Sequence, residues 1–374
     1  MNMISFNVFF KFCYCIRLVT GWDLSNFNIG TNYYISSIAI YRTKAFLALP
    51  RSICHNNVSN PTVVDVPWTG DYIYPSTSIT ANLRHQILDY QQWGVCEDLQ
   101  DAISLAVEPK KPKIWILDKG SDLCPPKIAS FTLSYNHIYS RHILENIPRA
   151  NLNILVIDPE YDQYGYRAYI GNAGNNILLV FSLEELKLWE LTLSPIDYPF
   201  GTISVDFMSI SKTEPVLYIA GKNTTELFSL KLEQIRDSED ILTSNQVSSI
   251  FLHLGDSVEY NVTFHGHKLG LATGLETDLK SGLSYFMVND NVILRWLIGS
   301  PLRAEFHDVL AQSYEKLPYV SDLFTGPQYG LWALVNPLPP EQCIELNAIN
   351  ENIPKPRSRV VRILKYNKFL DSMS

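Results

Sequence analysis

The chain has 374 residues, a hydrophobic content of 46% and a formal net charge of −8 at pH 7. This much apolar sequence, with only 18% charged residues, argues against a disordered chain. The acidic balance argues against nucleic acid as a partner, since phosphate binding depends on clustered Lys and Arg, and no apolar run is long enough for a membrane span.

The first 21 residues form an ambiguous leader. Ile4 to Phe10 is a short apolar run, and Val19-Thr20-Gly21 offers small residues for cleavage. Lys11 and Arg17 interrupt the region that a signal peptide keeps apolar. We therefore expect residues 1–21 to be either a poor signal peptide or the product of a wrongly assigned start.

Aromatic-centred apolar runs recur along the rest of the chain. In order they are AFLALPR with Phe46, KIWILDKG with Trp115, RAYIGNAG with Tyr169, VLYIAGKN with Tyr218, LSYFMVND with Tyr285 and GLWALVNP with Trp332. The 286 residues from the first aromatic to the last make five intervals of about 57 residues, against about 40–50 for a four-stranded propeller blade. The repeat predicts an all-β, six-bladed β-propeller with modest insertions, formed as a single domain over residues 22–366 and followed by a tail, 367–374.

Three of these runs continue as hairpins. Residues 168–170 and 177–181 flank a GNAGNN turn, residues 217–220 and 227–230 flank GKNTT, and residues 285–288 and 292–296 flank NDN. Gly, Asn and Asp tolerate the positive φ of tight turns. A β-sandwich with similar hairpins is the alternative. The propeller is favoured because the units recur over nearly the whole chain and radial closure protects strand edges.

Helical signals are few. Residues 182–189 (SLEELKLW) could form two turns with Ser182 as N-cap. Residues 337–359, rich in Pro, Asn and Glu, predict an irregular excursion before a final strand, residues 360–364. Such a terminal strand often completes a propeller blade begun at the other end of the chain.

Cysteines and sequons point to secretion. The six cysteines, at positions 13, 15, 54, 96, 124 and 343, include no C-x-x-C pair, which argues against structural zinc. Their dispersed spacing suits one or two long-loop disulfides and an oxidising compartment. Sequons at Asn57, Asn223 and Asn261 are compatible with a secreted glycoprotein.

Two groups of side chains invite a metal interpretation. His265 and His267 are two apart and would share a face of a strand, but no acid at strand spacing supplies a third ligand. We expect hydrogen-bonded histidines and no metal there. Asp118, Asp158 and Asp206 each end an apolar run, so they either cap hairpin turns or converge as channel ligands for a hard cation.

No motif assembles a nucleophilic catalyst. The chain has no G-x-S-x-G elbow and no glycine-rich phosphate loop. No catalytic residue can be named and no cofactor is expected.

An ordered series of motifs resembles a known family. The matching segments are Leu49-Pro50-Arg51 ("PR"), residues 93–100 (WGVCEDLQ), residues 115–120 (WILDKG, compare "WVLDTG"), residues 124–128 (CPPKI, compare "CPPKL"), residues 168–170 ("AYIAD"), residues 331–336 ("LWVLSN") and residues 361–364 ("NFRIL"). Together they resemble the major royal jelly/yellow family of insects, with residues 93–109 closest to eggshell-associated members. Asn172 in place of the "AYIAD" aspartate, and Arg295 and Leu297 around Trp296, mark a divergent member.

The resemblance implies a six-bladed propeller with a disulfide between Cys96 and Cys124, closing a loop of roughly 29 residues and contributing on the order of 3 kcal/mol. Two buried free thiols are the alternative, while Cys54 and Cys343 could pair across the closing blade. Members that bind biogenic amines in the central channel suggest Asn336 as a ligand contact, since an amide can hold a hydroxyl or an ammonium; an Asn at a strand end is the plain structural alternative.

For function, the resemblance implies a secreted, extracellular, non-enzymatic protein. It would act in cuticle or eggshell formation with matrix proteins as partners, or bind small cationic amines or catechol-type compounds. The alternative is a dopachrome-converting isomerase of melanin formation, which needs a positioned acid or base. A third reading is a metal-dependent, lactonase-like propeller, which needs converging channel carboxylates.

Overall fold

The computed structural model describes residues 21–22, 24–29, 33–54, 58–68, 89–133, 139–161, 165–174, 176–195, 201–236, 258–343 and 357–366. The leader of residues 1–20 and the tail of residues 367–374 lie outside these ranges. None of the helices in the described chain is long and apolar enough to cross a bilayer.

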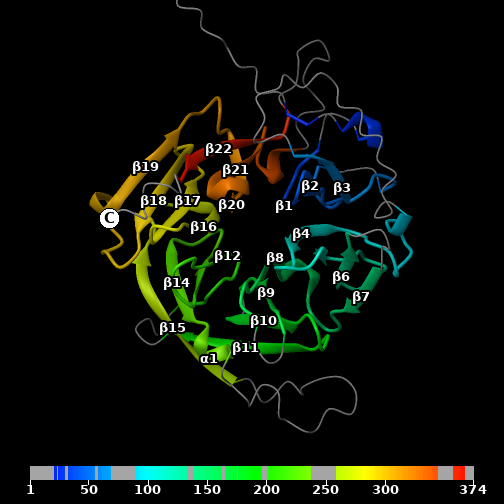
Figure 1. Ribbon diagram of the computed structural model, residues 1–374, viewed down its shortest axis with the longest axis horizontal. Helices are drawn as coiled ribbons and strands as arrows, with labels where there is room; N and C mark the ends of the chain where they lie inside the picture. The colour runs from blue at the N-terminus through cyan, green and yellow to red at the C-terminus, as the bar shows by residue number, and fades with distance from the viewer. Residues whose placement is uncertain are drawn as a thin grey trace, which may run out of the picture.

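The described chain is almost entirely β-structure, arranged in mainly antiparallel sheets around a central opening (Figure 1). The first sheet holds β1 (Ser37–Tyr41), β2 (Lys44–Ala48) and β3 (Val63–Pro67), and the second holds β4 (Ala102–Val107), β5 (Lys113–Asp118), β6 (Lys127–Thr132) and β7 (Tyr139–Ile143). An eight-stranded sheet follows, with β8 (Leu152–Ile157), β9 (Arg167–Asn172), β10 (Ile177–Ser182), β11 (Leu188–Pro195), β12 (Phe207–Ile210), β13 (Val216–Ala220), β14 (Glu226–Lys231) and β15 (Val258–His267).

The last two sheets complete the circle. They hold β16 (Ala272–Thr277), β17 (Gly282–Met287), β18 (Val292–Leu297) and β19 (His307–Gln312), then β20 (Tyr319–Thr325), β21 (Gly330–Asn336) and β22 (Arg359–Lys365). The helical elements are short: η1 (Ser25–Phe27), η3 (Arg149–Asn151), α1 (Glu233–Arg236), η4 (Ala304–Phe306) and η5 (Pro327–Tyr329). The predicted final strand is confirmed within β22.

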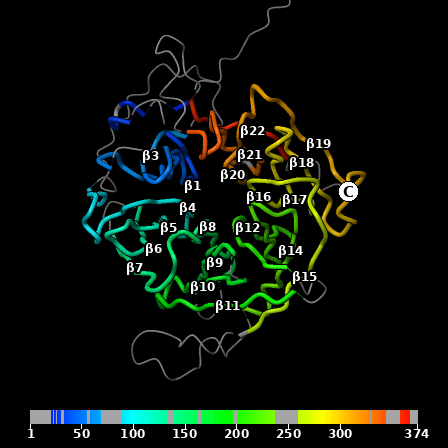
Figure 2. Tube along the Cα trace, turned by 180° about the vertical axis from the view of Figure 1, so that it is seen from behind, coloured from blue at the N-terminus to red at the C-terminus, as the bar shows by residue number. Residues whose placement is uncertain are grey.

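The inner strands form a closed circuit. Contacts run from β1 to β4, β8, β12, β16 and β20, and from β20 back to β1. Figure 2 shows the same circuit from behind, with the first and last sheets side by side. The eight-stranded sheet takes part twice, because its edge strands β8 and β12 both lie at the opening while β11 and β15 join its two halves by parallel pairing. The fold is therefore propeller-like, and its inner strands line a channel.

The repeated aromatic residues fill the interfaces between sheets. Side chains alternate across a strand, so β5 directs Ile116 towards the first sheet and Trp115 towards the eight-stranded sheet. Phe46, Tyr218 and Trp332 likewise pack against the sheet that follows their own, whereas Tyr169 packs between the two halves of the eight-stranded sheet. The fifth run differs: Tyr285 packs backwards with Tyr218, and the neighbouring Phe286 fills the next interface. Because the two aromatic residues are consecutive, the sequence did not show which of them packs against the following sheet.

The predicted helix over residues 182–189 is wrong. Ser182 ends β10, a turn follows, and Leu188 begins β11. The hydroxyl of Ser182 does accept a hydrogen bond from the N–H of Glu185 at 3.1 Å, but the turn goes no further. The burial of Trp189, Leu191 and Leu193 on alternate positions of β11 outweighs the weak helical pattern.

Among the described residues, the C-terminal strand does not complete the first sheet, contrary to the sequence-based expectation. β22 pairs only with β21 in its own three-stranded sheet. Closure comes instead from contacts between the first segment and the last sheet. Trp22 donates its N–H to the carbonyl of Ser358 at 3.0 Å, and a disulfide joins Cys54 to Cys343 across 289 positions of sequence.

Candidate functional site in the central channel

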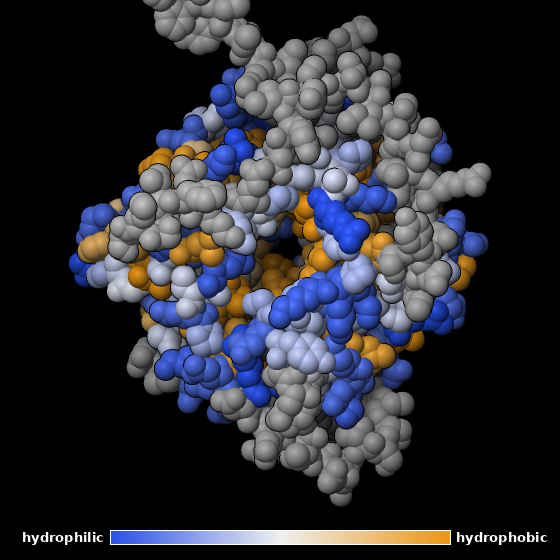
Figure 3. Space-filling model, in the orientation of Figure 1, coloured by the Kyte–Doolittle hydropathy of each residue, from blue (hydrophilic) through white to orange (hydrophobic). Residues whose placement is uncertain are grey.

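The central opening is visible through the space-filling view in Figure 3. Each inner strand starts beside the end of the second strand of its sheet, as Ala102 pairs with Asp118 and Tyr319 with Asn336. The channel therefore has two chemically distinct ends. Loops after the second strands surround the starting end, and turns after the inner strands surround the finishing end.

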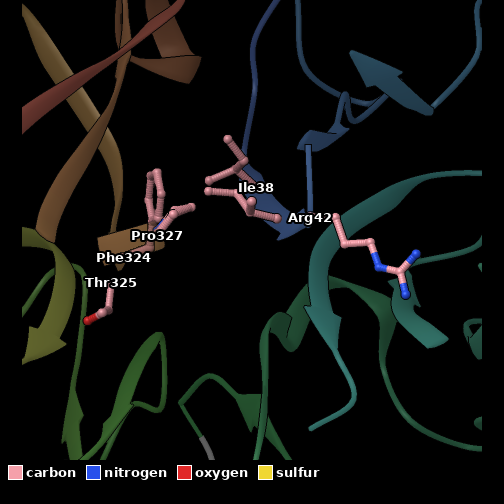
Figure 4. A pocket seen from close by; sticks show the side chains of 6 residues that line it. Ile38, Arg42, Phe324, Thr325 and Pro327 are labelled. Carbon is pink, nitrogen blue, oxygen red and sulfur yellow. The ribbon is translucent and has the colours of Figure 1, made fainter. Parts of the chain in front are cut away.

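A cavity of about 390 Å³ lies at the finishing end, between β1 and β20. Its lining is Ile38, Ile40, Arg42, Phe324, Thr325 and Pro327. In Figure 4, Ile38 faces Phe324 and Pro327 across the space, while the side chain of Arg42 extends away from them. The Arg42 guanidinium lies 5.1 Å from the ring of Tyr41. The space itself is thus lined mainly by apolar groups.

Phe324 is held in place by a second aromatic layer. Its ring meets Trp68 edge-on at 6.2 Å, and Trp68 meets Trp332 at 5.1 Å. Trp68 and Trp332 are both buried. This packing fixes the Phe324 ring at the cavity wall, where an aromatic face can attract a cation.

Two carboxylates flank the cavity. Glu276, at the end of β16, accepts hydrogen bonds from the Thr325 N–H at 3.0 Å and from the Thr325 hydroxyl at 2.5 Å. It also pairs with Lys212 at 3.2 Å. Asp322 lies two positions before Phe324 on β20, so the two side chains share a face of the strand.

Asp322 is a perturbed acid. Burial raises the pKa of Asp322 well above its usual range, and the neighbouring charge of Glu276 raises it further. Backbone hydrogen bonds from Leu323 and Ile38 partly offset this effect. A carboxyl with a strongly raised pKa, close to an apolar cavity, is the kind of group that functional sites exploit. Sequence analysis missed it; the available signal was a lone acid inside the apolar strand VSDLFT.

Asn336 has a different setting from the one a ligand contact needs. Its side chain is 1% exposed. The amide oxygen accepts from the Ile35 N–H at 3.0 Å and the Ser358 hydroxyl at 2.7 Å, and the amide nitrogen donates to the Ile35 carbonyl at 2.9 Å and the Ser321 hydroxyl at 2.8 Å. These four bonds use the full capacity of the amide. A ligand would have to displace one of them, so ligand binding by Asn336 stays a prediction.

The same geometry predicts a stability effect. Asn336→Ala would leave the Ile35 N–H and the Ser358 hydroxyl without their partner, and each orphaned group carries a desolvation cost. The Ile35 carbonyl and the Ser321 hydroxyl would keep their mutual bond at 2.9 Å. We expect a loss of about 2–3 kcal/mol in the free energy of unfolding, measured by urea denaturation. Asn153→Ala, which removes an amide that donates to the Asp206 carboxylate at 2.7 Å, should cost less. Equal losses of stability in the two variants would contradict the role of Asn336 in holding the Ile35 segment to the last sheet.

His265 and His267 do not share a face of β15, contrary to the sequence-based expectation. Gly266, between them, has φ +120° and lies in a bulge where β15 changes register with β14. His265 packs against Tyr218 and Trp296, whereas His267 packs against Phe264 on the other side. His265 Nε2 bonds to the Ser229 hydroxyl at 2.8 Å and His267 Nδ1 to the Thr225 hydroxyl at 2.9 Å.

The three sequence-selected aspartates do not converge. Asp118 accepts the N–H groups of Gln100, Asp101 and Gly120 and pairs with Lys127, Asp158 pairs with Arg236 and the Tyr169 hydroxyl, and Asp206 bonds to Asn153, Ser204 and the Lys222 N–H. Each aspartate thus serves a turn or an ion pair in its own sheet. Within the described ranges no three side chains of His, Cys, Asp or Glu gather as metal ligands.

The two disulfides lie at the starting end of the channel. A disulfide joins Cys96 to Cys124, the pair that the family resemblance implies, and a second joins Cys54 to Cys343. Cys13, Cys15 and the sequon residue Asn57 fall outside the described residues. Asn223 and Asn261 are exposed, as glycan attachment requires; their glycosylation stays a prediction.

Comparisons with solved structures give remote likenesses. The extracellular domain of BT4673 from B. thetaiotaomicron is 10% identical with a TM-score of 0.45, and the match covers 80% of this chain but 31% of that one. Virginiamycin B lyase from Staphylococcus aureus is 11% identical at a TM-score of 0.43, covering 81% and 77%. U3-55K is 9% identical at 0.46, covering 88% and 81%. Such remote likenesses bear on neither ligand nor activity.

No curated protein matches the chain. The family model described as Major royal jelly protein matches residues 102–368. This stretch includes the strands from β4 to β22 and therefore both carboxylates of the channel. The chain belongs to the major royal jelly protein family.

Proposed function

We propose that this protein is a secreted, non-enzymatic propeller whose central channel binds a small organic cation carrying an apolar or aromatic body. The supporting observation is the apolar cavity whose lining residues Ile38 and Thr325 donate backbone N–H groups to the carboxylates of Asp322 and Glu276. Apolar groups can receive the body of such a ligand, the Phe324 ring can face its ammonium, and Asp322 can supply the opposite charge. Two disulfides and the acidic chain are compatible with an extracellular cation binder.

Binding would be coupled to a proton. Burial and the neighbouring charge of Glu276 raise the pKa of Asp322, whereas an ammonium placed next to it favours the ionised form. The ligand would therefore bind the carboxylate and release the carboxyl proton. Affinity should rise with pH through the raised pKa of Asp322 for as long as the ligand amine stays protonated.

Calorimetry with dopamine, serotonin and histamine tests this proposal. We expect heat for at least one of them, with proton release seen as a dependence of that heat on the ionisation enthalpy of the buffer. Asp322→Asn should weaken binding at least about tenfold, or about 1.4 kcal/mol. The matched control is Asp290→Asn, an exposed acid in the β17–β18 turn. No heat for any amine, or equal effects of the two variants, would contradict the proposal.

The same substitution should stabilise the fold. A carboxyl whose folded pKa is raised is protonated in the native state at a pH where the unfolded chain has released its proton. Stability is then lost as pH rises above the unfolded pKa of about 3.9. Asp322→Asn should raise the unfolding midpoint at pH 7 and change it little at pH 3.5. A variant that is no more stable than the original protein at pH 7 would contradict the raised pKa of Asp322.

Dopachrome isomerisation is the second candidate, and the raised pKa of Asp322 is the observation that favours it. Tautomerisation needs a group that can donate and accept a proton near neutral pH. Loss of dopachrome absorbance faster than in buffer, abolished by Asp322→Asn and kept in Asp290→Asn, would support an enzyme. A rate equal to that of buffer would leave only the binding role.

The architecture completes the proposal. We infer one domain over residues 22–366 with six blades, counting the eight-stranded sheet as two. The inner-strand circuit of β1, β4, β8, β12, β16 and β20 supports this count. An experimental structure with a different number of blades would refute it. The resemblance also suggests a role in cuticle or eggshell matrix. Among the described residues, the channel is where we find groups suited to bind an organic cation.

A further inference from the structure

The lining of the cavity includes a cation as well as apolar groups. Ile38, Ile40 and Arg42 stand at alternate positions of β1 and the turn that follows it, and all three line the space. At about 3.3 Å per residue, Arg42 lies about 13 Å beyond Ile38 in the direction of the strand. The lining therefore extends along β1 to a guanidinium-bearing residue at the finishing end of the channel.

The acid of the proposed site lies at the opposite, deeper end of this lining. The Ile38 N–H donates to the Asp322 carboxylate. One position earlier on β20, the Ser321 hydroxyl donates to the Ile35 carbonyl at 2.9 Å, so β20 runs beside the first segment at this level. Phe324 follows Asp322 by two positions on the same face of β20 and lines the cavity further towards the finishing end. An acid, an aromatic ring and a cation thus succeed one another along the cavity.

The Arg42 guanidinium is not neutralised by a neighbouring acid. Among the described side chains, no carboxylate lies within ion-pair distance of it, and its contact is with the face of the Tyr41 ring at 5.1 Å. Lys44, two positions on, instead pairs with Asp65 at 3.2 Å. Arg42 is exposed, and in Figure 4 its side chain extends away from the other lining residues. An exposed arginine exchanges rotamers readily, so the guanidinium can turn towards a ligand in the cavity.

The backbone at Arg42 is in a conformation that disfavours a side chain. Tyr41 pairs with Lys44 across a two-residue hairpin turn, and Arg42, the first central residue of that turn, has a φ of +55°. Glycine adopts this conformation without the steric cost that a Cβ brings. Strained non-glycine residues concentrate at functional sites. The turn beside the cavity therefore carries a charged side chain at a position where the backbone alone would favour glycine.

We propose that the cavity selects a bipolar ligand, with an ammonium at one end of an aromatic or apolar body and an oxyanion at the other. This inference rests on the proposed cation binding and names the class of its ligand. The ammonium lies at Asp322, the body packs against Phe324, and the oxyanion accepts hydrogen bonds from the Arg42 guanidinium, whose planar fork suits such groups. An α-amino acid carries both charges on one carbon, too close together to reach Asp322 and Arg42 at once.

Three probes that share one body test the proposal by calorimetry on the full chain. Phenethylamine carries the ammonium alone, phenylalanine adds a carboxylate beside the ammonium, and para-(aminoethyl)benzoate adds the carboxylate at the far end of the ring. We expect para-(aminoethyl)benzoate to bind about tenfold more tightly than phenethylamine, a difference of about 1.4 kcal/mol. Phenylalanine should bind no more tightly than phenethylamine, because its carboxylate lies at the wrong end of the body.

Two variants assign the preference to its residue. Arg42→Gln should reduce the affinity ratio of para-(aminoethyl)benzoate to phenethylamine to about one. Arg303→Gln removes the same charge from an exposed arginine before η4 and should keep the ratio near ten. Binding of phenethylamine without a gain from the far carboxylate would overturn the bipolar ligand and leave cation binding standing. Binding of none of the three probes would overturn both, and a tenfold ratio that persists in Arg42→Gln would refute the role of Arg42.

Discussion

Replacing Cys54 and Cys343 by serine should lower the free energy of unfolding by about 4–5 kcal/mol. The disulfide links the loop after β2 to the chain beyond β21 across 289 positions of sequence. It therefore ties the two ends of the ring, where the described residues share no strand. A cross-link over so long a loop removes much entropy from the unfolded chain.

The Cys96–Cys124 pair supplies the matched control. It closes a separation of 28 positions within one sheet region, and its removal should cost about 3 kcal/mol. Urea denaturation of both double-serine variants gives the order. Hydrogen exchange should show added opening in the first and last sheets of the Cys54/Cys343 variant. An equal or smaller loss of stability for that variant would mean that the other contacts between the first segment and the last sheet, such as Trp22 with Ser358, are sufficient to close the ring.

Replacing Lys127 by methionine should cost about 3–5 kcal/mol. Lys127 and Asp118 lie 3.1 Å apart with side chains 1% and 0% exposed. Three backbone N–H groups also bond to Asp118, so its carboxylate is fixed at the end of β5. Removing the ammonium leaves a buried negative charge without its counter-ion.

A double-mutant cycle checks this interpretation. Asp118→Asn combined with Lys127→Met removes both charges, and the pair should lose less stability than Lys127→Met alone. Thermal or urea unfolding of the four proteins gives the coupling energy. If the single variant loses under about 1 kcal/mol, water must already reach the pair and the burial argument fails.

Part of the channel chemistry could have been anticipated. Asp322 interrupts an apolar strand, which is unusual for a charged side chain. Its approach to Glu276, 46 positions earlier in the sequence, depends on the packing of β16 against β20. A local sequence pattern does not reveal that two residues so far apart in the chain lie close together. The sequence-based choice of Asn336 selected a residue where the first and last sheets meet, and the structure places its amide among backbone and hydroxyl partners.

The residues alone determined the strands and their hairpins, because alternating apolar side chains and Gly, Asn or Asp turns act over only a few positions. They also marked the repeating aromatics that fill the sheet interfaces. Tertiary structure decided the rest. The bulge at Gly266 separates His265 from His267, and the disulfide between Cys54 and Cys343 joins the loop after β2 to the chain beyond β21. Each depends on contacts between distant segments, which local sequence patterns do not encode.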